Sequence, residues 1–345
     1  MTMEEMARII GVSRITLSKV MNGKDGVSEE TRNRVMEYVR KYNFEPDSSA
    51  RSLVGKKEPI IGFFTTYSEE GGKTHITSHF ATELVNFVVN AAQKRGYKTL
   101  VSITQREDDF SEVEKYMNSG LIRGAILLGY ATGSNDLQYL SRKGLPLVLI
   151  NQEEEMELPN ISLVNMNDEP WGYYAIESLV KRNHRRLLYI TCSRRRLPIR
   201  RRTRGVRRAL ADFQDCILSF EECYGEFSED VSYEEVRKRY AEKAEDYPTG
   251  IFAANDQMAI GAINALKDLG IRVPEDVSVI GFDDISISKY VSPALTTIHC
   301  DFKEVAEQSV SILTDCIEGK AGKCHRELKL EFMMRESLAD HKEET

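Results

Sequence analysis

The sequence predicts an α/β protein of 345 residues, in which a small all-α head precedes a larger core of doubly wound parallel sheets. Apolar residues recur at helical spacing within residues 1–46, whereas from Ile60 onward short apolar runs alternate with amphipathic stretches. Charge divides the chain in the same way. Residues 1–57 carry eleven Lys and Arg against eight Asp and Glu, which leaves −10 for the rest of a chain of net charge −7. A basic head can bind phosphate while the acidic core is repelled from it.

The head begins with two short helices joined by a tight turn. The first buries one face, made by Met3, Met6, Ala7 and Ile10. Gly11 suits the turn, and Ser13 is the expected N-cap of the second helix. Because Leu17 and Val20 face inward at a spacing of three, the other side chains are left for a face that can enter a DNA groove. These are Arg14, Ile15, Thr16, Ser18 and Lys19.

A third helix follows a stop signal at Asn22-Gly23. Ser28 is its expected N-cap, and Thr31 stands where a full capping box would have Glu, so only half of the box is present. On spacing alone, an ordinary helical bundle with a solvated face would explain the segment equally well.

The residue types and their spacing resemble the LacI/GalR family of bacterial repressors. The head carries AxxxGVSxxTxSxVxNG and then VSEETRxRVxxxxxxxxFxPxxxARSL, and the similarity runs on to SPALTTIHCDF and the terminal MMRES. It includes IFAANDQMAIGAINALKDLGIRVPEDVSVIGFDD at 251–284 and covers essentially the whole chain. The resemblance implies a helix-turn-helix DNA-binding domain at 1–46, a hinge helix and linker at 47–58, and a core at 59–345 that resembles periplasmic binding proteins.

Within the core, strands and helices alternate twice. IIGFF, KTLVSI, GAILLG and PLVLIN form the first series of strands, with helices expected near 81–95, 111–119 and 136–143; LLYIT, GIFAAND and VSVIGFD form the second. The family resemblance adds that the chain crosses between two lobes more than once. It places lobe 1 at about 59–161 and 290–322, and lobe 2 at about 162–289 and 323–338.

The resemblance also implies a homodimer that binds a palindromic double-stranded operator, because one small head covers only a half-site. Arg14, Ile15 and Lys19 are expected at base edges, and Thr16, Ser18 and Asn22 at phosphates. In the hinge helix, DSSARSLV at 47–54, Ala50 and Leu53 are expected at the minor groove, with Leu53 as a wedge between base pairs. So short a helix is unstable alone, so we expect it to fold only on DNA.

An effector is expected in the cleft where the strands of both sheets end. Family positions match Arg202, Asn255 and Asp283 as contacts of a sugar-like molecule, Phe227 as a stacking aromatic ring, and His79 and Phe80 as a second wall. Asp256 and Asp284 also follow strands. For these two, capping of the next helix is as good an explanation as ligand binding.

The chain departs from the family at 194–208, SRRRLPIRRRTRGVRR from Ser193, where nine arginines crowd what we expect to be a loop. A solvated face is the usual role of such a run. The segment could instead form a cleft mouth that attracts an acidic or phosphorylated sugar, since guanidinium groups bind carboxylate and phosphate in a bidentate way. An auxiliary contact to DNA or to an acidic partner is a third possibility.

Other classes fit less well. The chain has no GxSxG, GxxxxGK[ST] or HExxH motif, and its six histidines are scattered, so no enzyme is predicted and neither a cofactor nor a metal is expected. The six cysteines (Cys192, Cys216, Cys223, Cys300, Cys316 and Cys324) show no paired or metal-binding spacing, and reduced thiols are expected. A sugar-binding protein without gene control is the rival interpretation, but such a periplasmic protein has a signal peptide and no DNA head. A cytoplasmic location is therefore expected.

Overall fold

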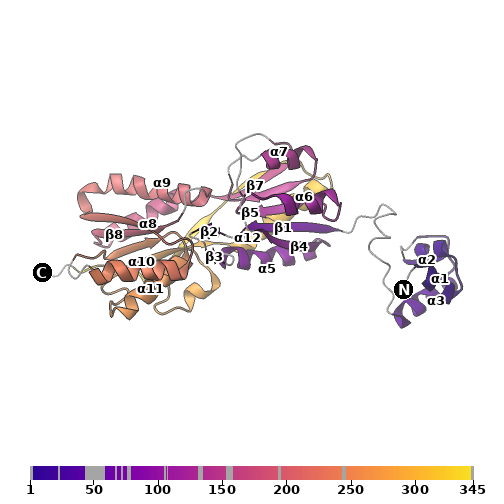
Figure 1. The fold of residues 1–345 in the computed structure, drawn as a ribbon, viewed down its shortest axis with the longest axis horizontal. Helices are drawn as coiled ribbons and strands as arrows, with labels where there is room; N and C mark the ends of the chain where they lie inside the picture. Colours follow the sequence, from indigo (N-terminus) through magenta and orange to yellow (C-terminus); the bar gives the residue numbers. More distant parts are fainter. Residues whose placement is uncertain are drawn as a thin grey trace. The chain divides into compact units, whose positions relative to one another are not determined.

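A computed structural model shows two compact units, Met1–Glu58 and Pro59–Thr345, as expected from the change in sequence pattern. The structure describes residues 3–21, 24–42, 59–66, 68–70, 73–75, 79–104, 106, 108–130, 135–152, 158–192, 196–242 and 246–342. Figure 1 shows the elements along the chain. The hinge segment 47–54 lies outside the described residues.

The head contains the three expected helices, α1 (Met3–Ile10), α2 (Arg14–Met21) and α3 (Glu29–Lys41). Their shared core is made by Met6, Ala7, Ile10, Leu17, Val20 and Val35, all buried. Both predicted caps are confirmed: Ser13 Oγ accepts a hydrogen bond of 3.0 Å from the Thr16 backbone N–H, and Ser28 Oγ accepts one of 3.4 Å from Thr31.

The first lobe is a parallel sheet in the order β13-β7-β6-β5-β1-β4. Its strands are β1 (Ile60–Thr66), β4 (Lys98–Thr104), β5 (Ala125–Leu128), β6 (Leu147–Ile150), β7 (Ile161–Met166) and β13 (His325–Leu328). Neighbouring residues of β1 point to opposite faces: Phe63 packs in the core that α5 (His79–Lys94) and α12 (Phe302–Ile317) cover, and Phe64 in the core under α6 (Ser111–Asn118) and α7 (Asn135–Arg142). A hairpin, β2 (Ser68–Glu70) and β3 (Lys73–His75), precedes α5.

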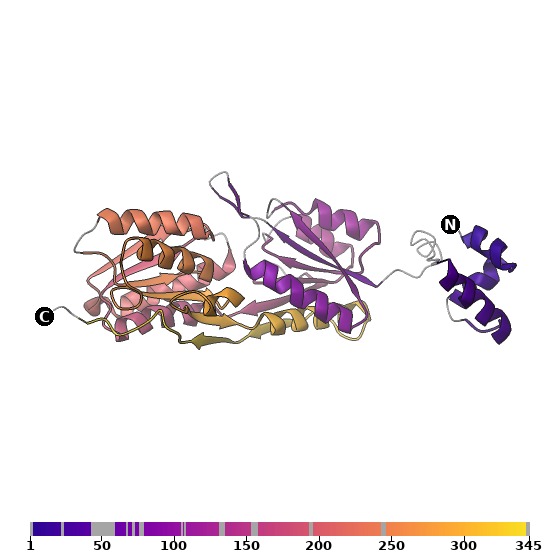
Figure 2. The same cartoon turned by 90° about the horizontal axis from the view of Figure 1, so that it is seen from below.

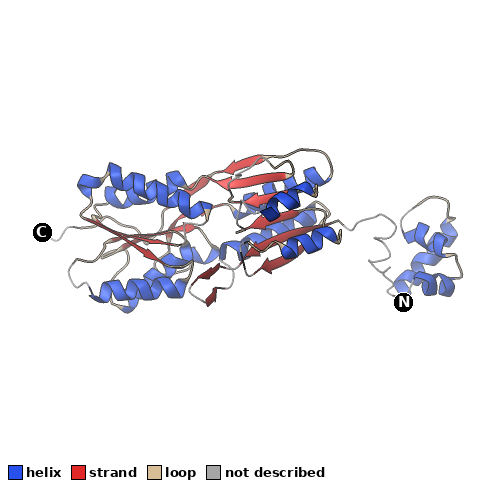
Figure 3. Cartoon of the chain, turned by 45° about the horizontal axis from the view of Figure 1, so that its top comes forward, coloured by secondary structure: helices blue, strands red, loops and turns tan. Residues whose placement is uncertain are grey.

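The second lobe repeats this plan in the order β14-β12-β11-β10-β8-β9. Its strands are β8 (Arg186–Thr191), β9 (Ser219–Tyr224), β10 (Gly250–Ala253), β11 (Ser278–Asp283), β12 (Thr296–Cys300) and β14 (Leu330–Met333), of which β14 alone among these described strands is antiparallel to its neighbour. The helices are α8 (Glu169–Lys181), α9 (Leu197–Asp212), α10 (Glu229–Glu242) and α11 (Asp256–Asp268), with 3-10 turns η1 (Gln214–Cys216) and η2 (Ser286–Lys289). Figure 3 shows helices against both sheets.

The predicted lobe boundaries of 161/162, 289/290 and 322/323 are wrong by one strand each. The chain crosses after β7, after β12 and between β13 and β14, three times within the described residues. Each strand belongs to the sheet whose backbone groups it pairs with: β7 pairs with β6 in the first lobe, β12 with β11 in the second, and β13 with β7 in the first. The apolar runs look the same in either sheet, so sequence could not place them. Figure 2 shows the last part of the chain, from β12 onward, running along both lobes.

Candidate DNA-binding face and interlobe cleft

The face of α2 that was predicted to contact DNA points away from the hydrophobic core of the head. Ile15 is 71% exposed, which is high for a large apolar side chain and consistent with a surface that another molecule covers. Arg14 Nη1 lies 3.1 Å from Glu4 Oε1, with both side chains largely exposed, so the pair is weak and Arg14 can leave it. Thr16, Ser18 and Lys19 are partly exposed on the same helix. Asn22, Ala50 and Leu53 lie outside the described residues.

The core has a cleft of about 780 Å³, part of it open to solvent, at the carboxyl ends of strands from both lobes. It is lined by Thr65, Thr66, Phe80, Leu128, Gly129, Ile150, Asn151 and Gln152 from the first lobe and by Arg196, Pro198, Ile199, Arg202, Phe227, Asn255 and Asp283 from the second. Five of the six residues predicted to contact an effector are among them. His79, the sixth, is exposed and does not line the cleft.

Arg202 is the centre of the cleft's polar network. Its Nε donates to Asp168 Oδ1 at 2.8 Å, its Nη1 donates to the carbonyl oxygen of Ala254, and its Nη2 lies 3.5 Å from Asp283 Oδ1. The guanidinium also lies over the ring of Phe282, 3.4 Å from its centroid. One side chain therefore joins the ends of β10 and β11 to the segment after β7, where the chain enters the second lobe.

Burial and charge act against each other in this network. Burial raises the pKa of Asp283 well above its ordinary value, and Arg202 lowers it only in part. The pKa of Asp168 is raised for the same reason. Burial alone would lower the pKa of Arg202, but Asp168 and Asp283 raise it, so the guanidinium stays charged. Asp283 also has a backbone φ of 110°. Residues other than glycine rarely adopt this conformation, and those that do are concentrated at functional sites.

Helix capping falls to a different residue than expected. Asn255, and not Asp256, is the N-cap of α11: its Oδ1 accepts a hydrogen bond of 2.9 Å from the Met258 N–H. Its Nδ2 has no protein partner among the described residues and is available to the cleft. Asp256 is completely buried and bonds inside the second lobe, while Asp284 binds His299 at 2.9 Å and Arg335 at 2.6 Å. Neither aspartate lines the cleft.

The arginine-rich segment is mostly helix and not a loop, since α9 begins at Leu197. Three of its arginines are exposed and pair with acids of their own lobe, as a solvated face would: Arg204 and Arg208 with Glu169 at 3.2 and 3.6 Å, and Arg207 with Glu222 at 3.8 Å. Arg201 donates to the Met166 carbonyl at 3.1 Å. Only Arg196 and Arg202 line the cleft, and Arg194 and Arg195 lie outside the described residues.

Arg196 differs from Arg202 because it has no acidic partner among the described residues. Its guanidinium lies 5.5 Å from the centroid of the Phe227 ring. It also reaches the first lobe, where a Cβ added at Gly129 would lie 2.8 Å from Arg196 Nη1, so Gly129 leaves room for it. Among the described residues, the cleft therefore contains one guanidinium that is paired with acids, Arg202, and one that has no acidic partner, Arg196.

Sequence reasoning did not single out ten of the fifteen lining residues, among them Arg196, Asn151 and Gln152, nor the buried partner Asp168. Arg196 was included in the arginine run without being singled out. Asn151 and Gln152 directly follow β6, so the rule that strand ends deliver side chains to the cleft would have found them. Within the described residues no group of three or more His, Cys, Asp or Glu could hold a metal ion, and no helix is both long and apolar enough to cross a bilayer.

Comparison with known proteins gives two family matches. Residues 2–47 match the model for bacterial regulatory proteins of the lacI family, and residues 176–338 match a periplasmic binding protein-like domain. The chain is 30% identical over 341 residues to the HTH-type transcriptional repressor PurR of Mannheimia succiniciproducens, with 98% of each chain covered.

Solved structures are similar over the same length. A lac repressor dimer bound to operator and the anti-inducer ONPF matches with a TM-score of 0.81 and 25% identity, covering 98% of this chain and 99% of that one. A LacI family transcriptional regulator from Enterococcus faecium with bound ribose matches with a TM-score of 0.68 and 25% identity, covering 82% of this chain and 100% of that one.

Proposed function

We propose an effector chemistry for this chain on the premise that it belongs to the LacI family of bacterial regulatory proteins and is a DNA-binding transcriptional repressor, not an enzyme. The effector is a small hydroxylated molecule, a sugar acid or sugar phosphate, that binds in the interlobe cleft. Its binding controls the affinity of the head for the operators of sugar-related genes. The LacI-type head makes a binding protein without gene control the weaker alternative.

One observation carries the proposal: Arg196 faces the cleft without an acidic partner among the described residues. A partly buried guanidinium loses hydration, and a carboxylate or phosphate restores its hydrogen bonds in a bidentate geometry. Arg202 is already engaged, because it forms a buried ion pair with Asp168 at 2.8 Å and lies 3.5 Å from Asp283.

The remaining lining suits a hydroxylated ring. Asp283 and the Nδ2 of Asn255 offer an acceptor and a donor for hydroxyl groups, and Phe80 and Phe227 offer apolar faces. The bound ribose of the Enterococcus faecium regulator supports a sugar-like ligand in this fold. That ligand is neutral, so a neutral sugar is the alternative that Arg196 argues against.

On the DNA side, we propose a cytoplasmic homodimer whose two α2 helices read a palindrome. Arg14, Ile15 and Lys19 lie at base edges, and Thr16, Ser18 and Asn22 at phosphates. Ala50 and Leu53 contact the minor groove. The lac repressor dimer on operator supports this arrangement. The effector acts by changing the spacing of the two hinges.

A thermal-shift screen tests the effector. Full-length protein is mixed with neutral sugars, sugar acids and sugar phosphates at two salt concentrations. We expect a sugar acid or phosphate to raise Tm most, and less so at high salt because partly exposed ion pairs are screened. Arg196→Ala should remove the response, whereas Arg204→Ala, on the same helix but outside the cleft, should retain it. Stabilisation by neutral sugars alone, unchanged by salt or by Arg196→Ala, would refute the proposal.

A further inference from the structure

Three consecutive residues after β10 point to three different parts of the core. Asn255 lines the cleft and caps α11. Asp256 points into the interior of the second lobe. Gln257 reaches the first lobe, where its Oε1 accepts a hydrogen bond of 3.1 Å from the His79 N–H, the first residue of α5. The segment that faces the ligand is thus two residues from a bond to the other lobe.

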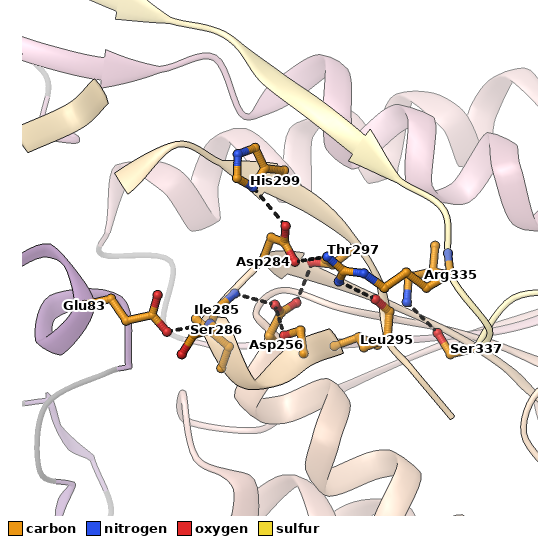
Figure 4. A network of polar contacts seen from close by, with 12 residues as sticks. Glu83, Asp256, Asp284, Ile285, Ser286, Leu295, Thr297, His299, Arg335 and Ser337 are labelled. Carbon is orange, nitrogen blue, oxygen red and sulfur yellow. Dashed lines mark hydrogen bonds and ion pairs between the residues drawn. The ribbon is translucent and has the colours of Figure 1, made fainter. Parts of the chain in front are cut away.

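The buried carboxylate of Asp256 fixes the segment that follows β11. It accepts hydrogen bonds from the Ile285 N–H at 3.0 Å, from Ser288 Oγ at 2.5 Å and from Thr297 Oγ1 at 2.5 Å. A Cβ at Gly281 would lie 2.2 Å from Asp256 Oδ1, so the carboxylate can take this position only beside glycine. Figure 4 shows Asp256 with its bonds to Ile285 and Thr297.

That segment also bonds to the first lobe. The Ser286 N–H donates to Glu83 Oε1 at 2.6 Å, and Glu83 lies on the first turns of α5 (Figure 4). Asp283, three residues before Ser286, lines the cleft. Two of the cleft-lining segments of the second lobe, those of Asn255 and Asp283, are therefore continuous with a hydrogen bond to the start of α5. Phe80, also at the start of α5, lines the cleft from the first lobe.

We propose that Gln257 and Glu83 form an interlobe latch, two hydrogen bonds that form and break together and set how readily the lobes close in the absence of ligand. Both acceptors come from side chains and both donors are backbone groups, so the bonds require a fixed distance between α5 and the two segments and no particular side chain at His79 or Ser286. Asp256 acts as a positioning residue, because it holds Ser286 in register with Glu83.

The latch rests on the proposed effector site for its regulatory meaning. A ligand that contacts Asn255, Asp283 and Phe80 moves the same three segments that the latch joins. Its binding therefore either favours or opposes the two hydrogen bonds of the latch. A weaker latch then changes the ligand concentration needed for switching, even though neither Gln257 nor Glu83 lines the cleft.

Amide hydrogen exchange of the full-length, ligand-free protein at single-residue resolution tests the latch without an identified effector. Glu83→Ala removes the acceptor of Ser286 only. If the bonds are coupled, we expect about tenfold faster exchange at both Ser286 and His79, although the acceptor of the His79 N–H is Gln257 and not the Glu83 carboxylate. Gln257→Ala should give the same pair of changes. Glu83→Gln keeps an acceptor oxygen and should leave both amides protected, as should Asn90→Ala, an exposed position on the same helix.

The proposal is overturned if Glu83→Ala raises exchange only at Ser286 and Gln257→Ala raises it only at His79. The two hydrogen bonds would then be independent. If Glu83→Ala unfolds the protein and so raises exchange throughout the core, the test of coupling is made with the reciprocal Gln257→Ala variant. Since no ligand is present, this outcome is separate from the thermal-shift screen: the latch can fail while the effector site stands, and the reverse.

Discussion

Arg202 Nε and Asp168 Oδ1 form an ion pair of 2.8 Å in which the two side chains are only 5% and 1% exposed. The pair joins α9 to the segment where the chain first crosses between the lobes. A ligand that disturbs Arg202 therefore acts on the crossing segment directly, and the cleft is connected to the relative position of the lobes through one guanidinium.

Asp168→Ala should be strongly destabilising, because it leaves a buried guanidinium with only Asp283 as counter-charge. We expect a loss of about 3 to 5 kcal/mol in the free energy of unfolding, measured by urea denaturation. Arg204→Ala breaks an exposed pair with Glu169 and should lose no more than about 1 kcal/mol. Similar losses for the two variants would show that the buried pair has no special role.

Asp256 should make stability depend on pH. Burial, partly opposed by three hydrogen bonds, raises its pKa from 3.8 to about 7. Because the folded protein holds this proton more tightly than the unfolded chain, the stabilisation is fully present below about pH 4 and is lost as the pH rises through 7. Asp256→Asn cannot titrate. Between pH 4 and 8 the free energy of unfolding of the native protein should fall by about 4 kcal/mol relative to this variant. Parallel pH profiles would contradict the assignment.

The local patterns of the sequence predicted the three helices of the head, α5 to α7, seven strands of the two sheets and five of the fifteen residues that line the cleft, but not α9, which was expected to be a loop. Ser13 and Ser28 cap the helices as their positions predict, and Asn255 and Asp283 reach the cleft because they end buried strands. The lobe boundaries failed because membership of a sheet depends on pairing between distant strands. β13 and β14 are separated by one residue, Lys329, yet belong to different sheets.

Asp168, which sequence reasoning missed, depends on long-range pairing too. Asp168 acts through Arg202, 34 residues away, and nothing in its own neighbourhood indicates a buried ion pair. The arginine run could not be divided into solvated and cleft-lining members until α9 fixed which of its faces turns inward. His79 shows the opposite error: its position next to Phe80 suggested a ligand contact, but the helix start points its side chain to solvent.

Arg14 offers a test of base readout. If it binds guanine in a bidentate way, Arg14→Ala should weaken operator binding by about 1 to 3 kcal/mol and relax one position in each half-site. Selection of bound fragments from a random library, followed by sequencing, measures both effects. A uniform loss across sequences would instead assign Arg14 to phosphate.

Leu53 is expected to act as a wedge in the minor groove. Leu53→Ala should reduce operator affinity by about tenfold or more, while non-specific binding stays nearly unchanged because phosphate contacts dominate it. Fluorescence anisotropy with operator and with unrelated DNA at one salt concentration separates the two. Equal losses of affinity for operator and for unrelated DNA would contradict the role of Leu53 as a wedge.

The most direct test of the account is the operator affinity of the native protein and of Asp283→Ala, with and without the sugar acid or phosphate that stabilises the protein best. We predict that the ligand changes the native Kd by about tenfold or more, within the usual range of coupling between sites. Asp283→Ala should bind operator equally well without ligand and show no response to it. An operator Kd that the ligand leaves unchanged in the native protein, or an Asp283→Ala variant that responds fully, would contradict control through the cleft.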